Sequence, residues 1–119
     1  MGCTSMKLKH GNNNAPHIVL VEYSPRYEEE AVSAAEKMEY KYPNLFQFEM
    51  RREALMSRKL EVSIYFNKNE AIGEPDARVH SKLSILKFPS DDWRSFLSNI
   101  DASLRTSKVE VTRAPQLVF

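Results

Sequence analysis

The chain has 119 residues, of which 17 are basic and 16 acidic, so the formal net charge is +1. Apolar residues make up 42% and charged residues 28%, the composition of an ordinary globular domain with one core. A charge this close to zero excludes strong, unspecific attraction of the whole surface to nucleic acid. The longest apolar run, Ile18–Val21, is too short to cross a bilayer, and no secretory signal is visible.

The start of the chain carries the single cysteine, Cys3, which excludes an internal disulfide and a CxxC redox pair. Residues 1–16 are expected to form a flexible N-terminal arm, because Gly11–Asn14 favours turns and cannot pack a core. The first 21 residues contain no Asp or Glu, a bias shared by organelle import sequences. A second hypothesis is acylation at Gly2 and Cys3, although Met6 stands where the usual pattern has Ser or Thr.

The segment from residue 17 to residue 42 predicts a strand followed by a helix. Ile18–Val21 is typical of a strand covered on both faces. Ser24 is expected to cap the helix, with Pro25 and then three glutamates in positions that suit a helix N-terminus. Pro43 disfavours helical geometry at Tyr42 and should end the helix there. Its apolar stripe consists of Tyr27, Ala31, Ala34, Ala35, Met38 and Tyr42.

Three further strands and a second helix follow. Residues 45–50 and 60–66 alternate between apolar and polar side chains, and residues 79–88 form a more polar strand. Residues 51–59 indicate a helical turn or a loop, and residues 67–78 a connection. Ser90 is expected to cap the second helix, with two aspartates in its first turn. The stripe of that helix consists of Trp93, Phe96, Leu97, Ile100 and Leu104.

The predicted order β-α-β-β-β-α over residues 17–106 gives an α/β domain, with a mixed four-stranded sheet and two main helices in two layers. The pattern leaves open whether the helices share one face of the sheet. Residues 107–119 are expected to form an extended C-terminal tail with an apolar tip.

This order resembles the thioredoxin-like superfamily. Tyr42-Pro43-Asn44 and His80-Ser81-Lys82 resemble the "FPG" and "HSK" segments of the selenoprotein W-like (Rdx) family. Pro43–Glu53 and Ser90–Leu104 resemble a turn, a strand and the final helix of the respiratory complex I accessory subunit. That subunit, like several mitochondrial ribosomal proteins, is a non-catalytic thioredoxin-like subunit of a mitochondrial complex.

Redox members of the superfamily carry CxxC, or a selenocysteine version, between the first strand and the first helix. Here Tyr23–Arg26 occupies that turn, and serine cannot perform thiol–disulfide exchange. The resemblance therefore implies a structural accessory subunit without catalytic residues, metal or cofactor, docked to other protein subunits in a larger mitochondrial assembly such as a respiratory chain complex. The cytoplasm is the other compartment considered. The alternatives are an Rdx-like redox protein that uses Cys3 or a partner's thiol, a mitochondrial ribosomal protein, and an acylated membrane-associated adaptor.

Two segments are predicted to bind partners. Arg51, Arg52, Arg58 and Lys59 form the densest basic cluster, which could contact a protein, RNA phosphate or an anionic headgroup. Leu117-Val118-Phe119 is an apolar tip that could gain order against a partner. Ser24 lacks the flanking glycines of a nucleophile elbow, and the three histidines lack metal-ligand spacing.

Overall fold

The computed structural model describes residues 3–7, 15–54, 57–82 and 86–107, and of residues 3–7 it describes the backbone alone. In chain order the elements are β1 (Cys3–Lys7), β2 (His17–Tyr23), the 3-10 turn η1 (Pro25–Tyr27), α1 (Glu28–Lys41), β3 (Phe46–Glu53), β4 (Leu60–Tyr65), β5 (Ala77–Ser81), the 3-10 turn η2 (Pro89–Asp91) and α3 (Trp93–Thr106).

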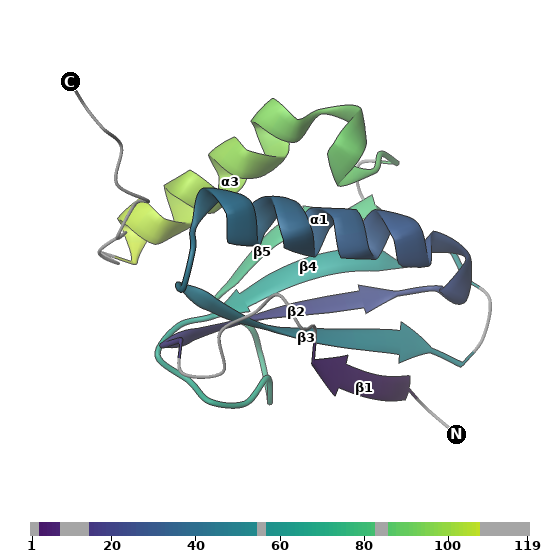
Figure 1. Cartoon of the computed structure of the whole chain (residues 1–119), viewed down its shortest axis with the longest axis horizontal. Helices are drawn as coiled ribbons and strands as arrows, with labels where there is room; N and C mark the ends of the chain where they lie inside the picture. The colour runs from purple at the N-terminus through teal and green to yellow at the C-terminus, as the bar shows by residue number, and fades with distance from the viewer. Residues whose placement is uncertain (1–2, 8–14, 55–56, 83–85, 108–119) are drawn as a thin grey trace.

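The strands form one mixed sheet in the order β1-β3-β2-β4-β5. β2 and β3 are parallel, as expected for strands joined by a helix, while β4 is antiparallel to β2 and β5 is antiparallel to β4. Both helices cover the same face of the sheet (Figure 1), which settles the point that the sequence left open. The predicted α/β fold, with a mixed sheet and two main helices in two layers, is confirmed, and the sheet contains a fifth strand, β1, beside the four that were predicted.

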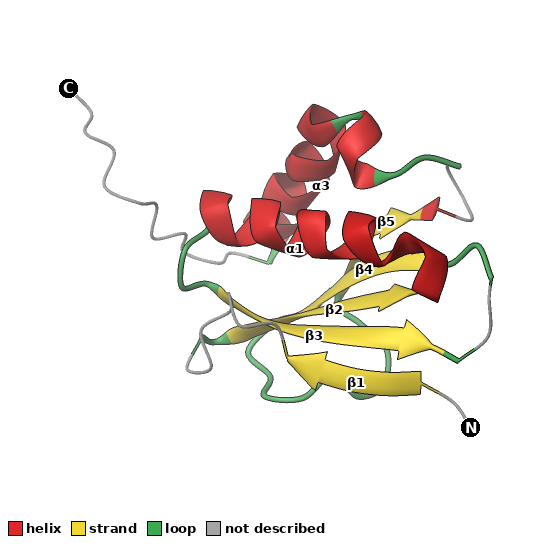
Figure 2. Cartoon of the chain, turned by 45° about the vertical axis from the view of Figure 1, so that its right-hand side comes forward, coloured by secondary structure: helices red, strands yellow, loops and turns green. Residues whose placement is uncertain are grey.

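The main core lies between this face of the sheet and the two helices. In α1 the buried positions are Ala31, Ala34, Ala35 and Met38, which repeat at the spacing of one helical face. In α3 they are Phe96, Ile100 and Leu104, with Trp93 and Leu97 partly buried beside them. Figure 2 shows α1 and α3 together above the sheet, with the opposite face turned away from both. The two predicted helical stripes are therefore the inner faces of the helices.

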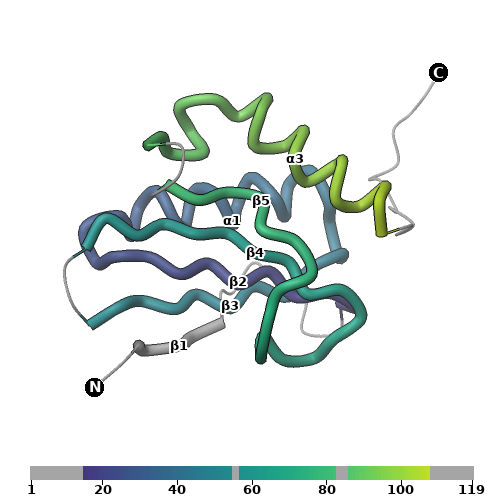
Figure 3. Tube along the Cα trace, turned by 180° about the vertical axis from the view of Figure 1, so that it is seen from behind, coloured from purple at the N-terminus to yellow at the C-terminus, as the bar shows by residue number. Residues whose placement is uncertain are grey.

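A small second core lies on the opposite face of the sheet. It consists of Ile18, Leu20, Tyr65 and Ala71. The connection between β4 and β5 folds back to reach it (Figure 3), and Tyr65 Oη donates a hydrogen bond of 2.8 Å to the carbonyl oxygen of Gly73. Because this connection covers Ile18 and Leu20, β2 is buried on both faces, as its continuous apolar run predicts.

The N-terminal segment differs from the prediction, because Cys3–Lys7 forms the edge strand β1 where a free arm was expected. β1 pairs antiparallel with β3, so that Cys3 lies opposite Glu53 and Lys7 opposite Glu49. The outer edge of β3 presents backbone hydrogen-bonding groups that would otherwise be left to solvent, and β1 satisfies them. The sequence of β1, CTSMK, is short and mostly polar and does not by itself predict a strand. Its strand conformation therefore depends on pairing with β3.

Strand and helix limits also differ from the prediction. A helical turn or a loop was expected over residues 51–59, but β3 continues to Glu53. It does so because strands pair with it on both sides. β5 spans Ala77–Ser81 rather than 79–88, and Leu86–Phe88 is not a strand. Asp92, not Ser90, caps α3, since its carboxylate accepts the Ser95 N–H at 3.1 Å. The hydroxyl of Ser90 instead donates to Glu30, at 2.6 Å.

Candidate functional site

The turn between β2 and α1 is the first candidate, because redox members of the thioredoxin-like superfamily carry their reactive residues there. Ser24 is fully buried, and its side chain makes no capping hydrogen bond to the helix. Its Oγ instead accepts the N–H of Ser57 at 3.1 Å, and its own N–H donates to the carbonyl of Lys59 at 2.9 Å. Ser24 therefore occupies the predicted cap position, at the start of η1, but its side chain does not act as a cap, since the hydroxyl anchors the segment that leads into β4.

An aromatic pair lies at the start of α1. The rings of Tyr27 and Phe88 meet edge to face, with centroids 5.0 Å apart. Lys82 Nζ lies 5.1 Å from the centroid of each ring, which is within the range of cation–π attraction. These contacts fix the chain that follows β5 against the beginning of the first helix.

The only cysteine lies at the same edge of the sheet as this turn. Cys3 is opposite Glu53, and the parallel register brings Tyr23 opposite Arg52, so that Ser24 follows at the level of Glu53. Two strand spacings therefore separate the backbones of Cys3 and Ser24, roughly 10 Å. Ser57 links this edge further, because its Oγ donates to Glu53 at 2.8 Å. The backbone of Cys3 thus lies at the sheet edge where the β2–α1 turn begins.

The basic cluster predicted to bind partners is not one patch. Arg51 and Arg52 are neighbours in β3, so their side chains leave opposite faces of the sheet. Arg51 pairs with Glu49 at 2.5 Å, Arg52 approaches Glu28 at 4.0 Å, and Lys59 approaches Glu22 at 3.5 Å. Arg58 is exposed.

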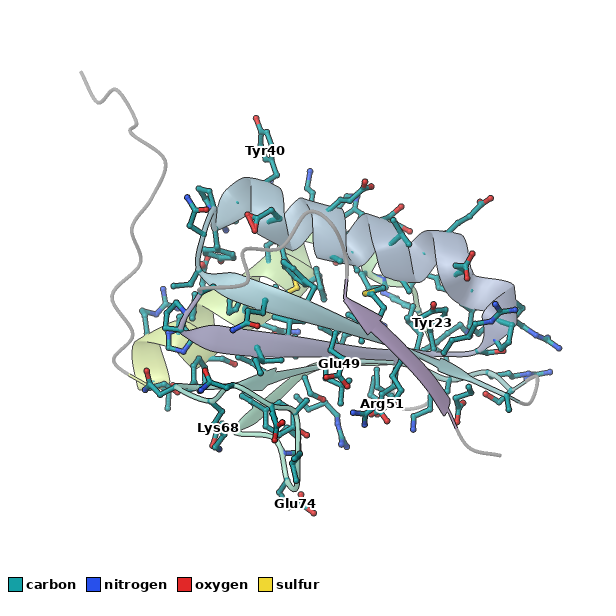
Figure 4. All side chains as sticks on the ribbon, turned by 60° about the horizontal axis from the view of Figure 1, so that its bottom comes forward. Tyr23, Tyr40, Glu49, Arg51, Lys68 and Glu74 are labelled. Carbon is teal, nitrogen blue, oxygen red and sulfur yellow. The ribbon has the colours of Figure 1, made fainter. Side chains whose placement is uncertain are left out.

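The face of the sheet away from the helices carries a row of charged side chains that the sequence analysis did not single out. The register aligns Arg51, Glu22, Glu61 and Ser81 across β3, β2, β4 and β5. Glu61 is buried and accepts a hydrogen bond of 2.5 Å from the Ser81 hydroxyl, and it forms an ion pair with Arg78, whose Nε lies 3.5 Å away. Glu49 and Arg51 project from this face in Figure 4, with Lys68 and Glu74 on the connection beside them. We call this face the open sheet face.

A signal for the open sheet face was present in the sequence. Glu61, Ser63 and Tyr65 alternate in β4 with apolar residues that face the helices. Alternation predicts that these polar groups share one face, but it does not show that the face lacks covering helices. Three acidic and three basic side chains on the open sheet face form ion pairs, so their charges balance. They are Glu22, Glu49, Glu61, Arg51, Lys59 and Arg78.

Two buried histidines lie in strands. His17 Nδ1 accepts the N–H of Asn67 at 2.9 Å, and burial lowers the pKa of His17. His80 packs against Phe96, with ring centroids 6.0 Å apart. Burial lowers the pKa of His80 too, although a hydrogen bond with the backbone of Lys87 acts in the opposite direction. His80 Nε2 is buried without a hydrogen-bond partner among the described residues.

A hollow of about 400 Å³ lies next to His80, at the beginning of α3. Its apolar lining comes from Phe88, Pro89 and Phe96, and Lys87 and Asp92 contribute charged groups. Asp92 already accepts hydrogen bonds from the backbone N–H and the hydroxyl of Ser95, which lower the pKa of Asp92. The hollow is thus lined by both apolar and polar side chains.

Several predicted features fall outside what can be described. Gly2 and Leu117–Phe119 lie outside the described residues, as do residues 55–56 of the basic segment. Within the described ranges, no three His, Cys, Asp or Glu residues gather as a metal site. Neither α1 nor α3 has the length and apolar character needed to cross a membrane.

Comparisons of the chain with protein-family models, with curated proteins and with solved structures each found no match.

Proposed function

We propose that this protein is a non-catalytic accessory subunit with a degenerate thioredoxin-like fold, docked in a larger protein assembly. The observation that carries the proposal is the burial and hydrogen bonding of Ser24. At the position where redox relatives expose a thiol or selenol, this chain has a hydroxyl that is fully buried and holds a neighbouring segment by a 3.1 Å hydrogen bond. A hydroxyl in that role supports the fold and offers nothing for thiol–disulfide exchange.

Protein partners are favoured over RNA by the pairing of the basic side chains. Arg51, Arg52 and Lys59 each lie within 4.0 Å of a carboxylate, so contact with phosphate would have to compete with these carboxylates. Arg51 and Arg52 also point to opposite faces of the sheet. These features support a protein-binding subunit over the alternative of a mitochondrial ribosomal protein held by RNA.

The proposed setting is a mitochondrial assembly such as a respiratory chain complex, as the resemblance implies. Affinity purification at native expression, followed by mass identification of co-purified proteins, tests the proposal. We expect the chain to be recovered with a defined set of subunits, in a particle far larger than 13.8 kDa. Recovery as a free monomer would rule out the accessory role, and recovery with RNA that depends on Arg58 would favour the ribosomal alternative.

A second candidate function is Rdx-like redox activity through Cys3. The specific observation in its favour is the register of β1, which brings the Cys3 backbone to the same sheet edge as the β2–α1 turn. A disulfide-reduction assay with the purified chain and with Cys3→Ser separates this activity from the accessory role. Turnover that disappears in Cys3→Ser would establish the redox function, whereas equal background rates would leave the accessory role in place.

The acylated adaptor is a third hypothesis, which depends on Gly2 and Cys3. Intact-mass measurement of the protein from its natural host detects an added acyl chain directly. A mass equal to that of the unmodified polypeptide would eliminate this hypothesis.

A further inference from the structure

The buried side chain of His80 carries a hydrogen-bonding atom that the described fold leaves without a partner. His80 is 5% exposed, and among the described residues nothing bonds to its Nε2. Buried polar atoms are paired in the great majority of cases, because an unpaired one gives up its bonds to water without compensation. His80 also lines the hollow at the beginning of α3, whereas Tyr23, whose buried hydroxyl is likewise without a partner, does not.

The protonation of the His80 ring determines which kind of group would satisfy Nε2. The hydrogen bond between His80 and the backbone of Lys87 favours a proton on the ring nitrogen that makes it, so that nitrogen is a donor. Since Nε2 has no partner, the donor is Nδ1. Burial lowers the pKa of His80 and keeps the ring neutral near pH 7, and a neutral imidazole with its proton on Nδ1 has an acceptor at Nε2. The missing group is therefore a hydrogen-bond donor.

The polar side chains that line the hollow direct their donors elsewhere. The hydroxyl of Ser95 donates to the Asp92 carboxylate at 2.8 Å. Asn99 Nδ2 donates to the carbonyl oxygen of Val79 at 3.3 Å. A donor for Nε2 would therefore come from a molecule that enters the hollow.

The lining of the hollow sets the other properties of such a molecule. Its volume of about 400 Å³ lies in the range of small-molecule sites, roughly 300–1,000 Å³. The rings of Phe88 and Phe96 belong to its lining and favour the edge or face of another aromatic ring. Lys87 and Asp92, which also line it, carry opposite charges, so the site selects neither a cation nor an anion.

We propose that this hollow binds a small neutral aromatic molecule whose N–H or O–H group donates a hydrogen bond to His80 Nε2. The ring of the molecule would lie against Phe88 and Phe96. Because Nε2 itself is closed to solvent, the donor reaches it by displacing part of the lining. The site is independent of the proposed accessory role, since every residue in it belongs to this chain.

Indole and benzofuran are the probes, because they share one shape and differ in the presence of an N–H donor. Each is titrated into the full chain, labelled with ¹⁵N, at about pH 7.5, where His80 is neutral. We expect a Kd near 1 mM for indole and a roughly tenfold weaker Kd for benzofuran. The amide resonances of His80, Ser95 and Asn99 should shift with indole, and the ¹⁵N resonance of His80 Nε2 should move as its lone pair accepts the bond.

The variant His80→Phe removes the acceptor and keeps a ring against Phe96. Replacing an unpaired buried polar atom by an apolar group leaves a fold largely intact, which circular dichroism checks. In this variant indole should lose its roughly tenfold advantage and bind like benzofuran. The matched control is His17→Gln, which changes the other buried strand histidine, outside the hollow, and should retain the preference for indole.

Four results would overturn the site. They are equal affinities of indole and benzofuran for the wild type, no binding of indole up to about 5 mM, an Nε2 resonance that is unchanged at saturating indole, and a preference for indole that persists in His80→Phe. If His80→Phe does not fold, the Nε2 resonance of the wild type decides the question by itself.

Discussion

Ser24 lies where a helix cap was expected, yet its hydroxyl serves a segment more than thirty positions away in the sequence. Its Oγ accepts the N–H of Ser57, which would lose its partner in a Ser24→Ala variant. We expect this change to lower the free energy of unfolding by about 1 kcal/mol, because a partly buried donor is left without an acceptor. Urea denaturation at neutral pH measures it.

Ser33→Ala is the matched control for this prediction, because Ser33 is exposed in α1. Alanine is the stronger helix former, so the control should be neutral or slightly more stable than the wild type. Equal stability of Ser24→Ala and the wild type would show that the hydroxyl does not hold the segment before β4.

The two buried histidines make stability depend on pH. Burial lowers the pKa of both His17 and His80 below their usual value of 6.5, so the unfolded chain takes up protons that the folded chain does not. Their contribution is fully present above about pH 7 and decreases as the pH falls below about 6.5, until the folded pKa values are passed. We expect a lower urea midpoint at about pH 5.5 than at about pH 7.5.

The variant His80→Gln tests how much of the pH dependence of stability comes from His80. Glutamine does not titrate, so the difference between the two midpoints should become smaller, whatever the change in stability at neutral pH. The carboxylates with lowered pKa titrate near pH 4 and below, outside this window. A midpoint that is the same at both pH values in the wild type would contradict the prediction.

Among the helices, α3 depends on its first turn. Asp92 accepts both the backbone N–H and the hydroxyl of Ser95, and these bonds lower the pKa of Asp92. Asp92→Ala should lower the thermal unfolding midpoint by roughly 4 °C, because two donors at the start of the helix lose their acceptor. Differential scanning calorimetry near pH 7 measures the shift.

Ser98→Ala is the control for this cap, since Ser98 is exposed in the middle of α3 and should change the midpoint little. The cap contribution should also diminish as the pH falls below about 4, because a carboxyl with a lowered pKa stabilises the fold only while it is ionised. An Asp92→Ala midpoint equal to that of Ser98→Ala would contradict the assignment of the cap.

The two helices are joined in the molecule by polar contacts that no single element contains. Tyr42, directly after α1, donates its hydroxyl proton to Asp101 in α3, and Lys41 Nζ lies 3.0 Å from the same carboxylate. Burial opposes ionisation of Asp101, but these two partners outweigh it and lower the pKa of Asp101. Near the other end, Ser90 donates to Glu30, and Lys37 Nζ lies 5.5 Å from the centroid of the Trp93 ring.

Tyr42→Phe tests this link between the helices. The ring and its contact with Phe46 remain, so only the hydrogen bond to a charged acceptor is lost. We expect the free energy of unfolding to fall by about 1–2 kcal/mol, measured by urea denaturation at neutral pH. Tyr40→Phe is the matched control, because Tyr40 is 84% exposed and projects away from the fold (Figure 4).

In an Asp101→Asn background, Tyr42→Phe should cost less than it does alone, since the charged acceptor is gone. Equal costs of Tyr42→Phe and Tyr40→Phe in the wild-type background would show that the contact adds no stability.

Much of the fold could be predicted because its signals are local. The spacing of Ala31, Ala34 and Met38 defines a helical face whatever the rest of the chain does, and the alternation around Val62 and Ile64 defines a strand face. The candidate site was less accessible. Arg51 and Arg52 were grouped as one cluster because residues 51–59 were interpreted as a turn or loop, whereas continued strand geometry separates them.

The sequence by itself determined the kinds of element, their order, and which side of each is apolar. The tertiary structure alone decided that both helices share one face, that Cys3–Lys7 joins the sheet as β1, and that Ser24 bonds Ser57. The physical reason is that periodicity depends on neighbours in the chain. Strand pairing and the choice among acceptors depend on groups that only folding brings together.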